Sequence, residues 1–164
     1  MRRPVTVFLG GGIGACLRAL LLAWLAPWGA SLPLPVLVAN VLGAFALGVV
    51  YVLADEAGLL RVETRLFLAA GVLGGFTTFS TFGWGADLLL GSGSDGAALI
   101  YLVASVAGGV AAVTAGMAVA RLMATRLART GMRPVGRLTA GGTPRGDARS
   151  DIAAVEAEDR EDLV

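Results

Sequence analysis

The sequence has 164 residues, of which 56% are hydrophobic and 15% are charged. A typical soluble domain is about 45–50% apolar and about 25% charged, so this composition indicates a membrane protein. The chain has no His, the commonest general base, and its single cysteine, Cys16, cannot form an intramolecular disulfide. We therefore do not expect an enzyme, and we expect no nucleic-acid partner.

Four apolar segments are long enough to cross a bilayer, which takes about 20 mostly apolar residues. We expect transmembrane helices over residues 4–26, 33–54, 66–90 and 97–123. The predicted fold is an all-α membrane protein with one four-helix transmembrane domain over residues 1–124. Two arginines before the first apolar run also suit a signal peptide, but no convincing cleavage site follows, so we expect a retained helix.

The first predicted helix contains Arg18, the only basic residue well inside a predicted span. A charged side chain within a membrane must face protein or water, so Arg18 indicates a functional site or a structural pair. The alternative is that its long side chain snorkels toward the membrane surface. In the same segment, Gly10 and Gly14 allow another helix to approach closely.

The second predicted helix contains Asn40, the only Asn in a chain that has no Gln. A buried amide offers two donors and acceptor capacity, so we expect Asn40 to donate to an anion or to a residue that lines its path. The alternative is an interhelical hydrogen bond, which contributes about 0.6 kcal/mol on average in a membrane.

The third predicted helix has an unusual centre. It combines two glycines, four hydroxyl side chains and two aromatic rings: Gly74, Gly75, Thr77, Thr78, Ser80, Thr81, Phe79 and Phe82. Each Gly costs a helix about 1 kcal/mol relative to Ala, so we expect a break at Gly74–Gly75. Backbone groups freed near the membrane centre need protein, water or an ion as partners. The alternative is that these residues only pack helices together.

The fourth predicted helix has Tyr101 and Ser105 one turn apart, so their hydroxyls lie on one face. Gly109 interrupts this row, and Thr114 lies beside its continuation. Residues 125–164 then form a segment rich in charge, with isolated apolar residues. Such a segment cannot bury enough surface to fold, so we expect a disordered, charged C-terminal tail.

Three stretches of the chain resemble motifs of the CrcB/Fluc family of fluoride channels: residues 11–18, 40–48 and 74–82. The resemblance implies a fluoride-specific channel in the cell membrane that exports cytoplasmic fluoride passively and so limits its toxicity. It also implies an antiparallel dimer with a structural sodium ion at its centre, bound by the backbone carbonyls of Gly74 and Thr77. The chain departs from the family pattern at Pro35–Val36, where Gly-Thr is expected.

The predicted anion pathway combines the residues of the three motifs with the hydroxyls of the fourth helix. It comprises Arg18, Asn40, Thr78, Phe79, Ser80, Thr81, Phe82, Tyr101 and Ser105. Hydroxyl and amide groups are hydrogen-bond donors, and aromatic rings have positive edges, so these side chains offer an anion partial positive charge. Arg18 is itself positively charged.

Two other functions fit a small four-helix membrane protein. A multidrug-type exporter coupled to protons needs a titratable carboxylate in the membrane, and no acidic residue lies well inside the four predicted spans. A purely structural or assembly role is the other alternative.

The arginines of the four-helix topology all fall on one side: Arg2, Arg3, Arg61, Arg65 and the cluster from Arg121 onward. Basic residues in short loops favour the cytoplasm, so we expect both termini to be cytoplasmic. This bias predicts insertion mostly in one orientation and pairing with an oppositely oriented paralogue. The alternative is an antiparallel homodimer in which the chain inserts both ways.

Overall fold

The computed structural model describes residues 2–28 and 32–129, and over this part of the chain all regular structure is helical. Four helical stretches are long and apolar enough to cross a membrane: Arg3–Trp28, Leu34–Glu56, Val62–Gly91 and Asp95–Arg126. The expected all-α architecture with four membrane-spanning helices is confirmed.

The first two spans each end in a turn of altered winding. Helix α1 covers Arg2–Leu25 and continues as a 3-10 turn, η1, over Ala26–Trp28. Helix α2 covers Leu34–Tyr51 and continues as a π-helical turn, η2, over Val52–Glu56. Pro35 lies in the first turn of α2, where its missing N–H removes no helical hydrogen bond.

The third span is built from four pieces. They are α3 (Val62–Arg65), the π-helical segment η3 (Leu66–Leu73), α4 (Gly74–Phe76) and α5 (Phe79–Gly91). Between α4 and α5 the backbone leaves the helix for two residues, so the predicted break near the centre of this span is confirmed.

The fourth span is one long helix, α6, over Asp95–Arg129. It begins after a tight turn in which Gly93 has φ of +72°, a left-handed conformation that favours glycine. The helix continues beyond the expected end at residue 123 and through the first residues of the predicted tail. The remainder of that tail, residues 130–164, lies outside the described residues.

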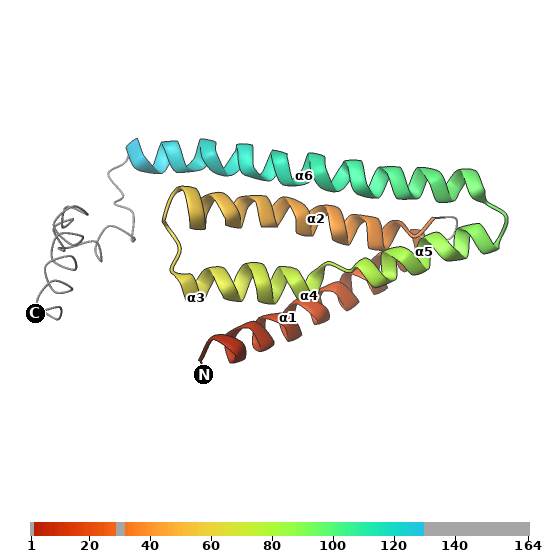
Figure 1. The fold of residues 1–164 in the computed structure, drawn as a ribbon, viewed down its shortest axis with the longest axis horizontal. Helices are drawn as coiled ribbons and strands as arrows, with labels where there is room; N and C mark the ends of the chain where they lie inside the picture. The colour runs from red at the N-terminus through yellow and green to blue at the C-terminus, as the bar shows by residue number, and fades with distance from the viewer. Residues whose placement is uncertain (1, 29–31, 130–164) are drawn as a thin grey trace, which may run out of the picture.

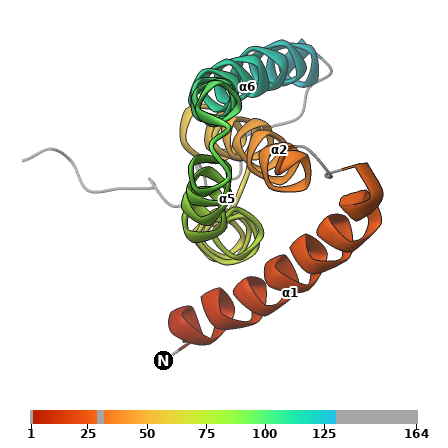
Figure 2. The ribbon, with the colours of Figure 1, turned by 90° about the vertical axis from the view of Figure 1, so that its right-hand side faces the viewer.

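Helices α2 and α6 form the most extensive contact in the bundle (Figures 1 and 2). Two glycines bring their backbones together. A Cβ on Gly48 would overlap the Val113 carbonyl, and a Cβ on Gly116 would overlap the Phe45 carbonyl. Close packing through small residues is how membrane helices associate when both sides are apolar.

Helix α1 crosses the rest of the bundle obliquely and packs mainly against η3 and α4 (Figure 2). Glycines again set the contact, as expected for Gly10 and Gly14. A Cβ on Gly10 would lie 2.7 Å from the Phe67 carbonyl oxygen, and one on Gly14 would overlap the Val72 carbonyl. The interior of the chain is thin, and large apolar side chains such as Phe8 and Trp24 face outward.

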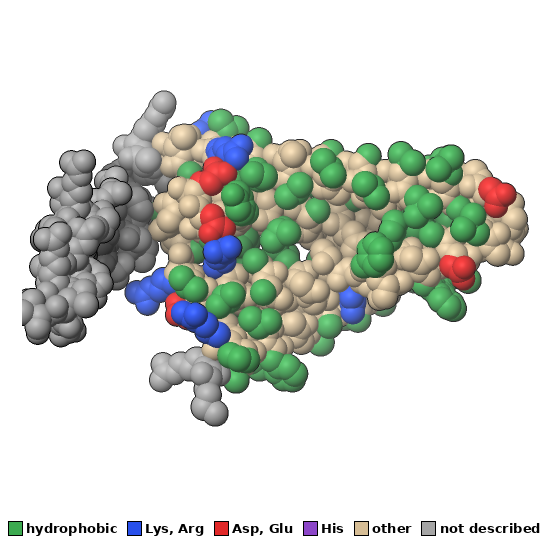
Figure 3. Space-filling model, viewed as in Figure 1, with side chains coloured by type: hydrophobic (Ala, Val, Ile, Leu, Met, Phe, Trp, Pro, Cys, Tyr) green, Lys and Arg blue, Asp and Glu red, His purple; other side chains and the backbone are tan. Residues whose placement is uncertain are grey.

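Charged side chains gather at the end of the bundle that carries α3, whereas the middle is largely apolar (Figure 3). Two ion pairs join the segments there. Arg65 lies 2.8 Å from Asp55, and Arg121 donates to both carboxylate oxygens of Glu56 at 2.7 and 2.8 Å. The two acidic residues at the end of the second span are therefore paired with arginines of the third and fourth spans.

Candidate functional site: the break in the third span

The break lies at Thr77 and Thr78, not at the glycine pair. Thr77 has φ −79° and ψ 155°, and Thr78 has φ −148° and ψ 122°, so both are extended. The predicted position of the break, Gly74–Gly75, is therefore wrong, since both glycines are helical. A Cβ on Gly75 would overlap the Gly11 carbonyl of α1, so this glycine serves close packing.

Thr78 starts the second half of the span as the N-cap of α5. Its hydroxyl oxygen accepts a hydrogen bond from the Thr81 N–H at 3.2 Å. Thr is a favoured N-cap residue because its side-chain oxygen replaces a missing helical acceptor. This local preference explains why the helix restarts here. The two extended residues before it, Thr77 and Thr78, are β-branched, and β-branched side chains suit an extended backbone.

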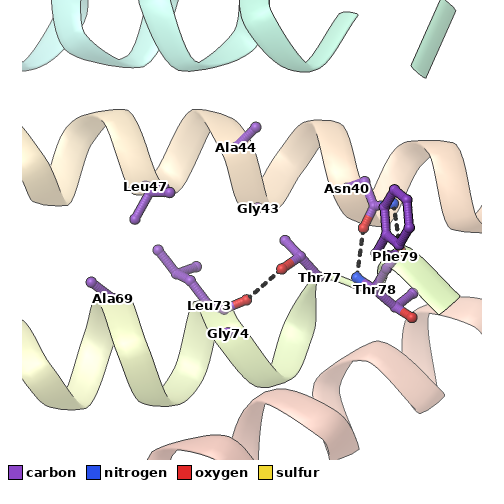
Figure 4. A pocket seen from close by; sticks show the side chains of 10 residues that line it. All are labelled: Asn40, Gly43, Ala44, Leu47, Ala69, Leu73, Gly74, Thr77, Thr78 and Phe79. Carbon is purple, nitrogen blue, oxygen red and sulfur yellow. Dashed lines mark hydrogen bonds between the residues drawn. The ribbon is translucent and has the colours of Figure 1, made fainter. Parts of the chain in front are cut away.

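Asn40 of α2 holds the break through two hydrogen bonds. Its Oδ1 accepts from the Thr78 N–H at 2.8 Å, and its Nδ2 donates to the Thr78 carbonyl at 3.0 Å (Figure 4). In a membrane, backbone groups released from a helix must be satisfied within the protein. The amide does so for both polar groups of Thr78, and its direct role as an anion ligand stays a prediction.

Arg18 approaches the same break from α1. Its Nη1 donates to the Thr77 carbonyl at 3.4 Å, and over the described residues it forms no ion pair. The side chain is half-buried. Arg18 thus contacts the protein interior through a backbone oxygen, which agrees with the expected structural pairing and leaves its place in the anion pathway a prediction.

The hydroxyls around the break form a small cluster. The Thr78 Oγ1 lies 3.2 Å from Ser80 Oγ and 3.1 Å from Thr81 Oγ1. Thr78 is buried, Thr81 is half-buried and Ser80 is exposed. Thr77 differs, because its hydroxyl donates to the Leu73 carbonyl of its own helix at 2.9 Å. The Thr78 hydroxyl therefore contacts two of the other three predicted hydroxyls, those of Ser80 and Thr81.

Three aromatic rings extend from the cluster toward α6. The centroids of Phe79 and Phe82 are 5.6 Å apart, and those of Phe82 and Tyr101 are 5.5 Å apart. Phe79 is 83% exposed, whereas Tyr101 is 2% exposed. The rings therefore connect the surface of the isolated chain with its interior.

Tyr101 and Ser105 have buried hydroxyls without a hydrogen-bond partner among the described residues. The structure thus leaves two unused donors one turn apart on α6, and Tyr101 of this row lies beside Phe82. Thr114 does not extend this row, because it is exposed and its hydroxyl donates to the Val110 and Ala111 carbonyls of its own helix. Gly109, between Ser105 and Thr114, has no side chain and so adds no hydroxyl to the row.

A cavity of about 350 Å³ opens beside the break (Figure 4). Residues of α2 and of the third span line it: Asn40, Gly43, Ala44, Leu47, Ala69, Leu73, Gly74, Thr77, Thr78 and Phe79. Both predicted metal ligands, Gly74 and Thr77, belong to this lining. The cavity is mostly apolar, and its polar side chains are Thr77 and Thr78 of the break and Asn40, which binds the break from α2.

Sequence reasoning missed three residues that shape the site. A Cβ on Gly43 would overlap the Thr77 methyl group, so Gly43 provides the space in which the break sits. Pro33 and the Tyr101 hydroxyl similarly both lie close to Gly85. The position of Gly43 three residues after Asn40, on the same face of α2, was the available signal. Nothing in the sequence pairs Pro33 with Gly85.

The family model described as "CrcB-like protein, Camphor Resistance (CrcB)" matches residues 5–117. The chain belongs to the CrcB family. It is therefore a multi-pass membrane protein, as its four spans indicate. The CrcB match begins in the first span, ends within the fourth and includes the break, and the expected family assignment is confirmed.

Several curated CrcB relatives resemble the chain over nearly their whole length. "Fluoride-specific ion channel FluC" of Roseiflexus sp. (strain RS-1) is 43% identical over 120 residues, covering 73% of this chain and 97% of the relative. The protein of the same name from Methylobacterium nodulans is 40% identical over 121 residues, covering 74% and 98%. "Fluoride-specific ion channel FluC 2" of Nocardia farcinica is 43% identical over 117 residues, covering 71% and 84%. These names describe channels, in agreement with the expectation of a non-enzymatic protein.

Proposed function

We propose that this chain is a fluoride-specific channel that lets cytoplasmic fluoride leave the cell passively and so limits its toxicity. The proposal rests on a single observation: curated relatives about 40% identical to the chain over almost their full length are named fluoride-specific ion channels. Neither alternative has a comparable observation in its favour. The acids at the end of the second span are ion-paired, so they do not suit a proton-coupled exporter.

The geometry around the break supports anion transport. A small anion must exchange its hydration shell for hydrogen-bond donors, and the Tyr101 and Ser105 hydroxyls are buried without a partner in the part of the chain that the structure describes. The ring edges of Phe79 and Phe82 carry partial positive charge. Phe82 lies beside the Tyr101 ring, and Phe79 lies beside Phe82. Such weak, repeated contacts let an ion enter and leave.

Reconstitution in liposomes tests the function. Vesicles loaded with potassium fluoride and treated with valinomycin should release fluoride when they contain this chain, whereas vesicles loaded with potassium chloride should retain chloride. Protein-free vesicles prepared with the same lipid are the control. Absence of fluoride release, or equal release of the two anions, would contradict the proposal.

We also propose that the working unit is an antiparallel dimer. Irregular backbone at membrane depth is tolerated only where protein or a wet cavity covers it, and in the isolated chain the cavity beside the break is open to the surface. Phe79, beside this cavity, is 83% exposed. A second subunit that covers the cavity would shield the break and the ring.

A structural sodium ion at the dimer centre is part of this proposal. The Thr78 N–H donates to Asn40, so it does not occupy the Gly74 carbonyl as in a continuous helix. Arg18 already donates to the Thr77 carbonyl at 3.4 Å, so a cation there must share that oxygen. Hard cations take several oxygen ligands, and two carbonyls per chain suffice only when two chains contribute.

Replacing sodium tests the cation. In detergent, the association of fluorescently labelled subunits should weaken when sodium is exchanged for N-methylglucamine at equal ionic strength. Potassium at the same concentration is the control for a general salt effect. Association that is identical in all three media would contradict a structural sodium ion.

We propose that both termini are cytoplasmic. In the described residues, Arg3, Arg61, Arg65, Arg121 and Arg126 lie at one end of the spans, and the other end carries Asp87 and Asp95. Basic residues in short loops favour the cytoplasm. This bias supports insertion mostly one way and pairing with an oppositely oriented paralogue, with the dual-topology homodimer as the alternative.

Cysteine labelling distinguishes the two dimers. The exposed native Cys16 is first replaced by Ser, and single cysteines are placed at Ser31, Ser94 and Ser150. With the gene expressed alone, a membrane-impermeant reagent should label Ser31→Cys and Ser94→Cys from outside but not Ser150→Cys. Equal labelling of all three, with fluoride efflux from this chain alone, would establish the homodimer.

A further inference from the structure

The Tyr101 hydroxyl is a buried hydrogen-bond donor of α6. The side chain is 2% exposed and its hydroxyl has no partner among the described residues. Leaving a buried polar group without a hydrogen bond costs about 1–3 kcal/mol. The residues that enclose this hydroxyl therefore determine which partner can reach it.

Gly85 lies next to this hydroxyl, and Pro33 lies next to Gly85. A Cβ placed on Gly85 of α5 would lie 2.7 Å from Pro33 Cγ, 3.0 Å from Pro33 Cβ and 3.2 Å from the Tyr101 hydroxyl oxygen. A contact under 3.0 Å requires something to shift. The proline ring, which precedes α2, and the tyrosine hydroxyl thus converge on a glycine that has no room for one methyl group.

The three elements meet at one end of the bundle. The start of α2, α5 and the first part of α6 lie together at the end opposite the charged cluster (Figures 1 and 3). From there the rings of Tyr101, Phe82 and Phe79 lead back to the break. An anion that follows these rings passes the Tyr101 hydroxyl next to Pro33 and Gly85.

We propose that Gly85 and Pro33 form a constriction beside the Tyr101 hydroxyl that selects the transported anion by size, an inference that rests on the proposed fluoride channel. The hydroxyl is buried and has no partner among the described residues, so its hydrogen bond is available to an anion. Because Gly85 adds no side chain between the proline ring and the hydroxyl, the passage is narrow but not filled, and it admits only the smallest anion. A larger anion, such as chloride, fits only when the proline ring is moved or removed.

The first test compares two glycines of the same helix. A Cβ on Gly83 meets no atom within 4 Å, so Gly83→Ala is the matched control for Gly85→Ala. We expect Gly85→Ala to slow fluoride efflux by about tenfold, because overpacking pushes the added methyl against the hydroxyl and the proline. Gly83→Ala should transport fluoride at the wild-type rate.

A double variant shows whether Gly85 acts through Tyr101. Tyr101→Phe removes the hydroxyl, so adding Gly85→Ala to it should slow efflux by a smaller factor than in the wild-type background. Equal factors in both backgrounds, or wild-type efflux in Gly85→Ala, would overturn the inference.

The second test measures selectivity. Pro33→Ala removes the ring atom closest to Gly85, so we expect chloride release to become measurable while fluoride release persists. Should Gly85→Ala not yield a monodisperse protein, this variant decides alone, and continued exclusion of chloride overturns the inference. Wild-type vesicles without fluoride release would instead refute the proposed function, which separates the two failures.

Discussion

The α2–α6 pair and the broken third span satisfy their backbone polar groups in different ways. In the pair, two continuous helices satisfy their own backbones, and Gly48 and Gly116 let those backbones touch. In the third span, two extended residues leave the helix, and side chains of other helices supply hydrogen bonds. Asn40 binds both polar groups of Thr78, and Arg18 binds the Thr77 carbonyl.

The difference teaches where the protein is rigid and where it can bind an ion. Backbone contacts at glycines leave no freedom, because even a methyl group would overlap a carbonyl. A side chain that donates to a freed carbonyl can be joined or replaced by another ligand. The first arrangement therefore provides a scaffold, and the second provides a place for ions.

The largest expected effect comes from filling the scaffold contact. Gly116→Ala should lower the free energy of unfolding by about 2 kcal/mol, because the added Cβ overlaps the Phe45 carbonyl. Gly109→Ala is the matched control on the same helix, since its Cβ meets no atom within 4 Å. Unfolding by SDS, followed by circular dichroism, measures both. Equal stability of the two variants would show that the glycine contact is not structural.

The next effect concerns the amide that holds the break. Asn40→Leu removes both hydrogen bonds that hold the extended backbone of Thr78 in place beside the anion path, so fluoride efflux should fall by about tenfold. Thr114→Val is the control, because that hydroxyl contacts only its own helix. Flux at the wild-type rate in Asn40→Leu would assign this residue to packing.

The aromatic rings should matter for transport and little for folding. Phe79→Ile and Phe82→Ile keep an apolar side chain but remove the ring edge, so each should slow efflux by about tenfold. We expect both variants to elute as wild type in gel filtration. If both transported fluoride at the wild-type rate while folding normally, the rings would not line the anion path.

The smallest effect is expected for the ion pair that links the ends of the second and fourth spans. Glu56→Gln removes its charge from the exposed contact with Arg121, and exposed pairs contribute little and are screened by salt. The unfolding temperature should drop slightly at low salt and match the wild type at high salt, with fluoride efflux unchanged. A large loss of efflux would show that this end of the bundle takes part in transport.

Much of the architecture was predictable, because a bilayer restricts a chain to a few solutions. Apolar length alone predicts the four spans, and small residues predict close helix contacts such as that of Gly14 with Val72. The break was also predictable, since hydroxyls and glycines share the centre of one span. Its position was not, because helix propensity points to Gly74–Gly75, whereas capping by Thr78 and packing of Gly75 on α1 decide it.

By itself, the sequence determined the membrane class, the number of spans, the family and the set of polar residues within the spans. Those features depend on composition and on neighbours along the chain. Only the tertiary structure decided that Asn40 bonds to Thr78, that Arg18 reaches Thr77, and that Pro33 and the Tyr101 hydroxyl both lie against Gly85. These contacts join residues far apart in the chain, and their geometry depends on how closely whole helices approach, which no local pattern encodes.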